Sequence, residues 1–399
     1  MRTRLGRRAM LAGVALALAA CGSSSGGGGT TTAAKITPPS VPMLQSLGPT
    51  EGQLNIIAWA GYAEDGSTDK SVDWVTPFEQ NTGCKVNVKI GNTSDEMVTL
   101  MKTGQYDGVS ASGDATLRLV YGGDVAPVNT SLVPNYATVS PFLKDRSWNS
   151  VNGQMYGIPH GWGANLLMWN TGSVTPAPDS WGSVFDANSP YKGKVTAYDS
   201  PIYIADAALY LKATKPDLKI TNPYELDDAQ FAAAVNLLKT QRTLVGEYWA
   251  DYTKEVQAFE SGDSVIGTTW QVITNLIDTD KKVGVQAIIP KEGSTGWSDT
   301  WMISSTAAHP NCMYKWMDWI ISPKVNAEVA EWFGEAPAQT KACSETADPK
   351  HCDVYHALDS AYANNIAYWT TPVKDCGDDR GAVCKDYTAW TQAWTEIKG

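Results

Sequence analysis

The residues whose chemistry stands out first lie in one ten-residue stretch, TGWSDTWMIS, at positions 295–304. Asp299 stands two positions after Trp297 and two positions before Trp301. Aromatic faces attract cations, and a carboxylate gives a cation a charge-assisted hydrogen bond. A surface loop with inward tryptophans and an outward acid would show the same pattern. The stretch is therefore a candidate ammonium site, and the rest of the chain must decide between the two interpretations.

Composition favours recognition of a small cation or a sugar over binding of nucleic acid. The chain has 16 tryptophans but only 6 phenylalanines, and its formal net charge is −11. Indoles beside acids suit cations and sugar rings. An acidic chain is a poor partner for a phosphate backbone, so we expect no nucleic-acid partner.

Catalytic motifs are weak in this sequence. The run GVSAS at 108–112 is close to the nucleophile elbow G-x-S-x-G but lacks its last glycine. A hydrolase that used Ser110 or Ser112 would need a base, and the four histidines show no evident nucleophile partner. They also lack the spacing of metal ligands. We therefore expect a protein that is not an enzyme and that carries no cofactor and no metal.

The N-terminus has the form of an exported lipoprotein. Four arginines within the first eight residues precede an apolar run, Met10 to Ala20, which is too short to span a bilayer. The run ends in LAAC, a lipobox whose Cys21 would take the lipid. We expect a signal peptide at 1–20 and a lipidated flexible tether at 21–51, rich in Gly, Ser, Thr and Pro. Sec and Tat export both stay open.

The remaining cysteines predict three disulfides. Removing Cys21 from the seven leaves six, an even number in a chain that we expect to be exported. The short spacings suggest Cys343–Cys352 and Cys376–Cys384, which leaves Cys84 to pair with Cys312.

Short apolar strands alternate with helical segments along the chain, which predicts an α/β fold with helices on parallel sheets. Strands are expected at 54–59, 85–90, 106–112, 194–200, 263–270 and 283–290, and helices at 94–101, 204–214, 227–241, 310–321 and 323–332. A further helix before Gly83 would start with a capping box formed by Thr76 and Glu79.

Almost the whole mature chain resembles a spermidine/putrescine-binding protein of a bacterial ABC importer. The motifs that carry the resemblance are GYAEDGSTD, GCKVNV, TSDEMVTLM, PIYIADAALYL and HPNCMYKWM, which begin at positions 61, 83, 93, 201 and 309. The resemblance implies a two-lobed periplasmic-binding-protein fold of type II, with hinge crossovers at 156–170 and 295–304 and the ligand in the interlobe cleft. Residues 52–162 and 299–342 would form lobe 1, and residues 163–298 and 343–399 would form lobe 2.

The resemblance also implies a binding site. Aromatic walls would come from Trp59, Tyr62, Trp270 and Trp297, the ammonium anchor from Asp299, and a second-lobe acid from Asp199. The chain departs from the family pattern at three positions: Ile202 stands where some relatives have an acid, and Asp114 and Glu335 stand where they have tyrosines. The far end of the ligand is therefore expected to be held differently.

These observations together predict a monomeric solute-binding lipoprotein that captures a small cationic amine and delivers it to the permease of an ABC importer. The choice between putrescine and spermidine does not carry over from the family. A zwitterion such as 4-aminobutyrate is an alternative, with Arg118 or backbone amides facing its carboxylate. A sugar receptor would share the fold, but Asp299 between the indoles argues against it.

Overall fold

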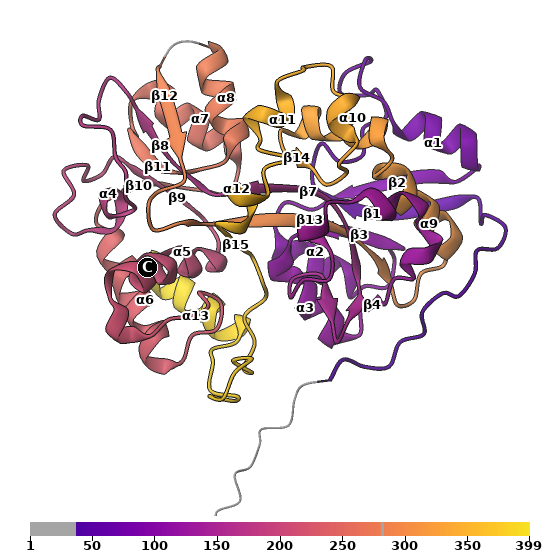
Figure 1. The fold of residues 1–399 in the computed structure, drawn as a ribbon, viewed down its shortest axis with the longest axis horizontal. Coiled ribbons are helices and arrows are strands. Elements are labelled where there is room, and N and C mark those ends of the chain that lie inside the picture. The colour runs from indigo at the N-terminus through magenta and orange to yellow at the C-terminus, as the bar shows by residue number, and fades with distance from the viewer. Residues whose placement is uncertain (1–36, 281–282) are drawn as a thin grey trace, which may run out of the picture. The chain divides into compact units, whose positions relative to one another are not determined.

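Two β-sheets organise the computed structural model, which describes residues 37–280 and 283–399. The signal peptide, Cys21 and most of the tether lie outside the described residues. Figure 1 shows the two sheets side by side, with β7 (Gly157–Ala164) and β13 (Ser294–Ser304) running through the middle.

The first sheet has the strand order β14-β7-β13-β3-β1-β2, and β4 and β15 also pair with β13. Its other strands are β1 (Gln53–Ala58), β2 (Lys85–Ile90), β3 (Gly108–Ala111), β4 (Val125–Ala126), β14 (Ala336–Pro337) and β15 (Ile366–Tyr368). Strands β1, β2 and β3 are parallel, as the sequence pattern predicts, whereas β13 is antiparallel to both β3 and β7. The sheet is mixed because β13 runs opposite to β1, β2, β3 and β7.

The second sheet has the order β10-β9-β11-β8-β12. These strands are β8 (Leu166–Asn170), β9 (Val195–Tyr198), β10 (Val245–Trp249), β11 (Ile266–Thr269) and β12 (Val285–Ile288). Strand β9 is parallel to β10 and β11, and β8 is antiparallel to β11 and β12. A separate two-stranded ribbon joins β5 (Ser150–Val151) to β6 (Gln154–Met155).

Helices surround both sheets, as the alternating sequence pattern predicts. Those on the first-sheet side are α1 (Val75–Thr82), α2 (Ser94–Met101), α3 (Gly113–Gly122), α9 (Pro310–Ile320), α10 (Pro323–Phe333), α11 (His351–Val354) and α12 (Ser360–Asn364). Those on the second-sheet side are α4 (Gly182–Phe185), α5 (Ile204–Thr214), α6 (Asp228–Gln241), α7 (Tyr252–Ser261), α8 (Gln271–Asp280) and α13 (Tyr387–Lys398).

The chain passes between the sheets at both expected crossovers. A single residue, Asn165, separates β7 in the first sheet from β8 in the second. Residues 289–293 connect β12 back to β13. The segment 343–399 divides its contacts, because β15 pairs with β13 while α13 packs on α6. The exact division of the chain into lobes stays a prediction.

The start of α1 differs from the sequence-based expectation, whereas α2 begins at Ser94 as expected. The capping box of Thr76 and Glu79 does not form, because Asp73 accepts the backbone N–H of Thr76 and Glu79 instead accepts that of Val86. For α2 the cap is Thr93, whose hydroxyl accepts the N–H of Glu96. In both helices a side chain that precedes the first turn accepts a hydrogen bond from one of the free backbone N–H groups.

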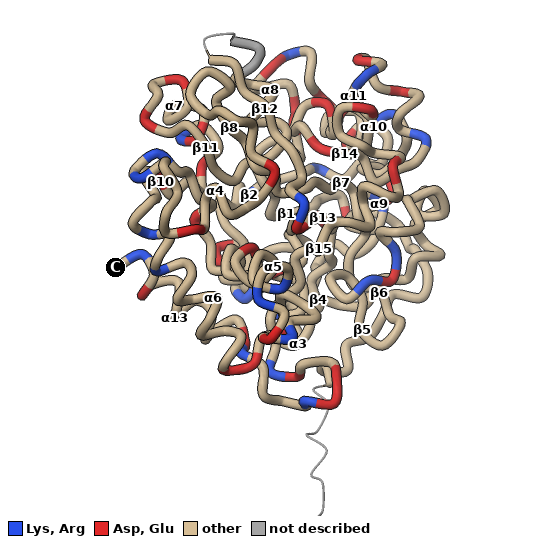
Figure 2. Tube along the Cα trace, turned by 60° about the vertical axis from the view of Figure 1, so that its left-hand side comes forward, with Lys and Arg blue, Asp and Glu red and all other residues tan. Residues whose placement is uncertain are grey.

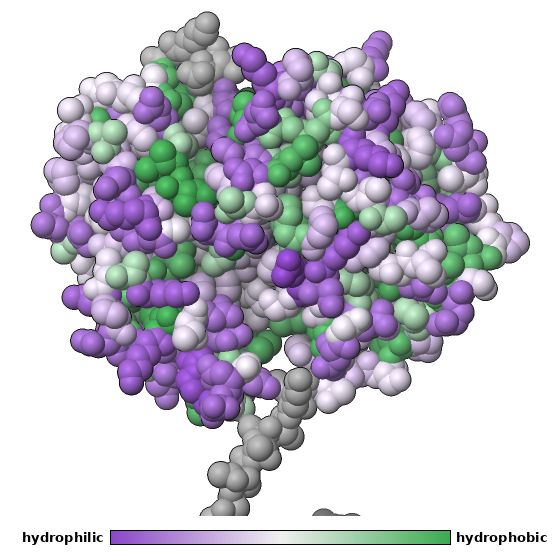
Figure 3. Space-filling view, in the orientation of Figure 1, coloured by the Kyte–Doolittle hydropathy of each residue, from purple (hydrophilic) through white to green (hydrophobic). Residues whose placement is uncertain are grey.

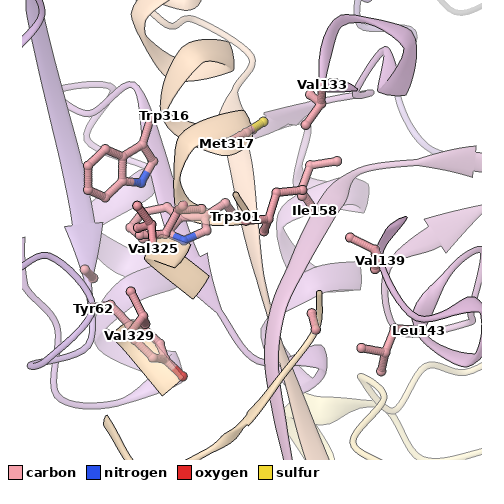
Figure 4. Packing of buried hydrophobic residues seen from close by; sticks show 14 of the residues in the cluster. Tyr62, Val133, Val139, Leu143, Ile158, Trp301, Trp316, Met317, Val325 and Val329 are labelled. Atoms are coloured by element: carbon pink, nitrogen blue, oxygen red, sulfur yellow. The ribbon is translucent and has the colours of Figure 1, made fainter. Parts of the chain in front are cut away.

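The core of the first sheet is rich in aromatic and branched side chains. Figure 4 shows Trp301 in the middle of this packing, with Trp316 beside it and Val325 and Ile158 nearby. The two indoles meet edge to face, with ring centroids 5.5 Å apart. Trp301 therefore points into the core of the first sheet.

All three predicted disulfides are present: Cys84–Cys312, Cys343–Cys352 and Cys376–Cys384. Figure 2 shows Lys and Arg interspersed with Asp and Glu along the chain. On the face seen in Figure 3, hydrophobic residues reach the surface as separate patches among hydrophilic ones. Within the described ranges no helix is both long enough and apolar enough to cross a bilayer.

Candidate functional site

In the interior of the first sheet, two buried carboxylates lie within hydrogen-bond distance of the same tyrosine hydroxyl. The Tyr62 hydroxyl oxygen lies 2.7 Å from Oδ2 of Asp299 and 2.8 Å from Oε2 of Glu335. Ser112 donates a 2.5 Å hydrogen bond to the other oxygen of Asp299. Asp299 is 3% exposed and Glu335 is 0% exposed, so water does not solvate the two carboxyl groups.

Strand β7 brings the two acids together. Gly161 pairs with Asp299 on β13 and with Pro337 on β14, so it lies between the strand that carries Asp299 and the strand that directly follows Glu335. A Cβ atom at Gly161 would lie 1.9 to 2.0 Å from the carboxyl atoms of Glu335. The register then skips His160, which makes this residue the extra one of a β-bulge. Glycine at position 161 is therefore a requirement of the acid pair.

Strand β13 runs beside both the aromatic cluster of the second sheet and the acids of the first sheet. Trp297, Asp299 and Trp301 are two residues apart, so they face the same side of the strand. Because each step of two residues advances about 6.6 Å, the three side chains meet different neighbours. Trp297 contacts the second-sheet cluster, Asp299 the tyrosine, and Trp301 the first core.

Burial sets the electrostatics of the acids. It raises the pKa of Asp299 to about 6, against the lowering effect of Ser112 and Tyr62. Burial, followed by the charge of Asp299, raises the pKa of Glu335 well above the usual value. The pKa of Tyr62 is raised by burial and by both neighbouring acids. A cation placed beside these groups would relieve the cost of keeping charge out of water.

The other two predicted acids have different partners. Asp114, in the first turn of α3, is 1% exposed and accepts a hydrogen bond from Ser94. Burial raises the pKa of Asp114 to about 6. Asp199 follows β9, and both of its oxygens lie 2.7 Å from the ammonium nitrogen of Lys398. It also accepts the indole N–H of Trp394, so its charge is already compensated from α13.

A continuous series of aromatic rings leads from the second sheet to the acid pair. Trp270 packs edge to face on Trp249 and on Trp297, with centroids 4.9 and 6.2 Å apart. Trp297 contacts Phe333 at 6.1 Å, and Phe333 stacks on Tyr62 at 4.1 Å. The predicted aromatic residues at 62, 270 and 297 therefore belong to one wall.

Trp270 is held in place by polar contacts at the crossover. Its indole N–H donates to Asn165, whose amide donates a 2.6 Å hydrogen bond to the Thr295 hydroxyl. That hydroxyl donates in turn to buried Asp206. Burial raises the pKa of Asp206 to about 7. These hydrogen bonds connect the aromatic wall to the β7–β8 crossover and to the start of β13.

A cavity lies next to the aromatic wall and is lined by residues of both sheets, among them Gly163, Ala164, Trp270, Trp297, Glu335 and Tyr355. The structure thus brings three predicted site residues to one cavity. Tyr355, on the disulfide-braced segment that contains α11, accepts a hydrogen bond from Asn275 of α8. Trp59 follows β1 and packs, partly buried, against two clusters of the first sheet.

Ser110, His160 and Glu335 line up as a serine, an imidazole and an acid. The Ser110 hydroxyl lies 2.8 Å from Nε2 of His160, and Nδ1 of that ring lies 3.7 Å from Glu335. All three residues are 0% exposed. A nucleophile needs access to its substrate, so this arrangement is a packed polar cluster of the core. No three described His, Cys, Asp or Glu residues are grouped in a way that would hold a metal.

Sequence reasoning missed four residues that shape the site: Ser112, Asn165, Tyr198 and Tyr355. The sequence suggests Ser112 only as a nucleophile, yet its hydroxyl donates a hydrogen bond to Asp299. Tyr198 stacks on Trp369 and approaches Trp270, with centroids 5.5 and 5.4 Å apart. Nothing in their local sequence signals these roles, because each depends on segments more than 70 residues away.

Two sheets joined by crossing strands, with a cavity lined from both, define the class of two-lobed periplasmic binding proteins. Residues 73–351 match the model of the bacterial extracellular solute-binding protein family, and the chain belongs to that family. Its members are binding proteins and not enzymes, and they are exported.

Relatives and solved structures agree with this assignment. The spermidine/putrescine-binding periplasmic protein of Escherichia coli is 24% identical over 295 residues, which cover 71% of this chain and 81% of that protein. The Tp0655 (TpPotD) lipoprotein of Treponema pallidum has a TM-score of 0.68 at 18% identity, over 87% of this chain and 99% of that one. A GABA receptor, Atu4243, has a TM-score of 0.63 at 19% identity, over 87% and 95%.

Proposed function

We propose that this protein captures a small linear amine, of the putrescine or spermidine type, and delivers it to the permease of an ABC importer. The observation that carries the proposal is the pair of buried acids, Asp299 and Glu335, beside a cavity walled by Trp270 and Trp297. Burying a carboxylate without a cation is costly, and an ammonium group compensates that cost. The names of the relatives, which are spermidine- and putrescine-binding, support the same ligand class.

The contacts of Arg118 favour an amine over a zwitterion. Its guanidinium lies 2.6 Å from Asp95 and 4.2 Å from the centroid of the Tyr387 ring. An arginine engaged in this way is poorly placed to receive the carboxylate of 4-aminobutyrate. Asp199 is compensated by Lys398, so we assign the far ammonium of a diamine to Asp114, with Trp59 as a further wall.

Titration calorimetry of matched variants tests the amine site. Asp299→Asn removes the charge of the anchor and keeps its shape. Removing one member of a buried charge pair costs about 2–5 kcal/mol, so putrescine should bind at least about 30-fold more weakly at 1.4 kcal/mol per decade. Asp217→Asn, on the exposed 3₁₀ turn Pro216–Leu218, is the matched control and should leave binding unchanged. Binding within threefold of wild type by folded Asp299→Asn would remove the main support for the proposal.

The same titrations identify the ligand. Putrescine, spermidine and 4-aminobutyrate are compared at equal concentrations. We expect the two polyamines to bind and 4-aminobutyrate to bind at least tenfold more weakly, because it brings a carboxylate to a site with buried acids. Preferential binding of 4-aminobutyrate would overturn the assignment to polyamines.

We also propose that the protein works as a monomer anchored to the cell membrane through a lipid on Cys21. The lipobox and the flexible segment after it support the anchor, and one structural relative is a lipoprotein. Two acyl chains hold a protein stably where a single chain does not. Cys21→Ser should therefore move the protein from the membrane fraction to the soluble fraction, or leave its signal uncleaved. Normal processing with unchanged membrane retention would contradict the anchor.

A further inference from the structure

The hydroxyl of Tyr62 has too few protons for its two neighbours. A phenol donates one hydrogen bond, yet its oxygen lies 2.7 Å from an oxygen of Asp299 and 2.8 Å from an oxygen of Glu335. If both acids were ionised, one of these short contacts would place two acceptor oxygens against each other. A second proton must therefore lie within this group of three residues.

The surroundings place that proton on Glu335. Asp299 receives hydrogen bonds on both oxygens, from Ser112 on one and from Tyr62 on the other, and both favour its ionised form. Glu335 has only the Tyr62 contact on its Oε2. A protonated Oε2 would donate to the Tyr62 oxygen, which in turn donates to Asp299. Burial and the Asp299 charge raise the pKa of Glu335 well above its usual value, which agrees with this order.

The other titratable groups described around Glu335 supply no permanent positive charge that could compensate an ionised Glu335. His160, from β7, has its Nδ1 at 3.7 Å from Oε1, but burial lowers its pKa to about 3 and leaves the ring neutral. From α11, His351 contacts the backbone carbonyl of Glu335 with Nε2, and burial lowers its pKa too. Tyr355, whose raised pKa is partly due to the charge of Glu335, lines the cavity from the same segment.

Beyond Asp299, the next acid is Asp114 of α3. Its pKa is raised chiefly by burial and, to a smaller extent, by the charge of Asp299. The charge of Arg118, which pairs with Asp95, lowers the pKa of Asp114 and partly opposes the effect of burial. An added positive charge at the cavity would therefore meet one ionised acid, Asp299, and one acid that can still lose a proton.

We propose that the site exchanges a proton for its ligand: Glu335 is a carboxylic acid before binding, and it releases that proton to solvent when an ammonium group enters the cavity. The protonated carboxyl and the ammonium become a carboxylate paired with the ammonium, and one proton leaves. This inference rests on the proposed amine-binding function. It makes Glu335 a residue whose protonation links affinity to pH.

The exchange is measured by titrating the purified protein with putrescine at pH 7.5 in phosphate and in Tris, two buffers with different enthalpies of ionisation. The difference in binding heat counts the protons released. We expect about one proton from wild type, since an amine with a pKa near 10 is already charged. Glu335→Gln keeps the shape of the protonated acid, so it should still fold and should release close to none. Asp217→Asn should release as many protons as wild type.

Affinity as a function of pH gives a second measurement that needs no variant. The proton must leave for the ligand to bind, so affinity should rise as pH rises. We expect the Kd for putrescine to fall about tenfold per pH unit between pH 6.5 and 8.5, a range above the titration of Asp299. Measurable binding with no proton release, or with a Kd independent of pH, would overturn the exchange. If neither putrescine nor spermidine binds at all, the proposed function fails and this inference fails with it.

Discussion

The two sheets compensate the charge of their acids in different ways. On the second-sheet side, Asp199 has a lysine and an indole N–H as partners, and its neighbours are aromatic. On the first-sheet side, hydroxyl groups of Tyr62 and Ser112 contact Asp299 and Glu335, and both acids are almost fully buried. An acid that is already paired gains little from a ligand cation. An acid kept without a cation makes the folded protein less stable until one arrives.

This contrast assigns different tasks to the two sides. The first sheet provides unpaired negative charge on rigid strands, and the second provides the indole of Trp270, fixed by Asn165 at the crossover. A ligand cation is attracted by the former, whereas its alkyl chain packs on the latter. The following predictions test that division.

The largest effect should come from Gly161→Ala. Its added Cβ would lie about 2 Å from the carboxyl of Glu335 and would displace the acid pair. We expect putrescine binding to weaken by at least about 100-fold, within the range for losing a buried charge partner. Gly48→Ala is the control, because its Cβ would meet the side-chain amide of Asn311 at 3.6 Å, an ordinary van der Waals distance. Calorimetry measures binding, and circular dichroism checks the fold. Unchanged affinity would show that the acid pair does not hold the ligand.

On the aromatic side, Trp270→Ala should weaken putrescine binding roughly tenfold, since cation–π contacts contribute about 0.5–2 kcal/mol each. Tyr252→Ala on α7, where the ring is 47% exposed, should have no effect. The same calorimetric titrations compare the two variants. A larger loss for Trp270→Ala than for Asp299→Asn would reverse the relative importance of the two sides.

Stability should fall as pH rises. The folded-state pKa values of Asp114, Asp299 and Asp206 are raised to about 6, 6 and 7, while unfolded Asp titrates near 4. The folded protein then binds more protons than the unfolded chain, so the free energy of unfolding decreases between about pH 4 and pH 7. We expect the ligand-free Tm to be at least a few degrees higher at pH 5 than at pH 7.5. A Tm that rises over this range would contradict the raised pKa values.

A variant of a buried acid away from the cavity distinguishes the effect of pH on stability from an effect on ligand binding. Glu255 of α7 is 0% exposed and accepts a hydrogen bond from Thr196, and burial raises its pKa well above the usual value. Glu255→Gln should raise the Tm at pH 8 relative to wild type, and change it less at pH 5. Putrescine affinity should stay the same. A change in affinity would mean that the second-sheet core also takes part in recognition.

The smallest effect on recognition should come from the disulfide Cys376–Cys384, which closes a short loop with a sequence separation of 8. Replacing both cysteines with serine should cost about 2.5 kcal/mol of stability on chain-entropy reasoning. Thermal unfolding measures that loss. Calorimetry should give wild-type affinity for putrescine, because the loop lies beside Glu225, away from the acid pair. Loss of binding in the folded double variant would place this loop in the site.

The local sequence predicted most secondary-structure elements, because apolar periodicity and turn residues act within a few positions. The helices at 204–214 and 310–320 and the strand at 85–90 follow such patterns. Disulfide partners were predictable because short spacings left one remaining pair. The helix cap at Asp73 was missed, since a competing acceptor a few residues away changes which side chain reaches the free N–H groups.

The sequence by itself determined the class of protein, the three disulfides and the presence of an acid between indoles. Only the tertiary structure decided which charges stay unpaired. Lys398 reaches Asp199 across 199 positions, and Tyr62 joins two acids that lie 36 positions apart. Charge compensation depends on distances of a few ångströms between remote segments, and no local pattern encodes such distances. For that reason Asp199 and Glu335 look alike in the sequence and differ in the folded protein.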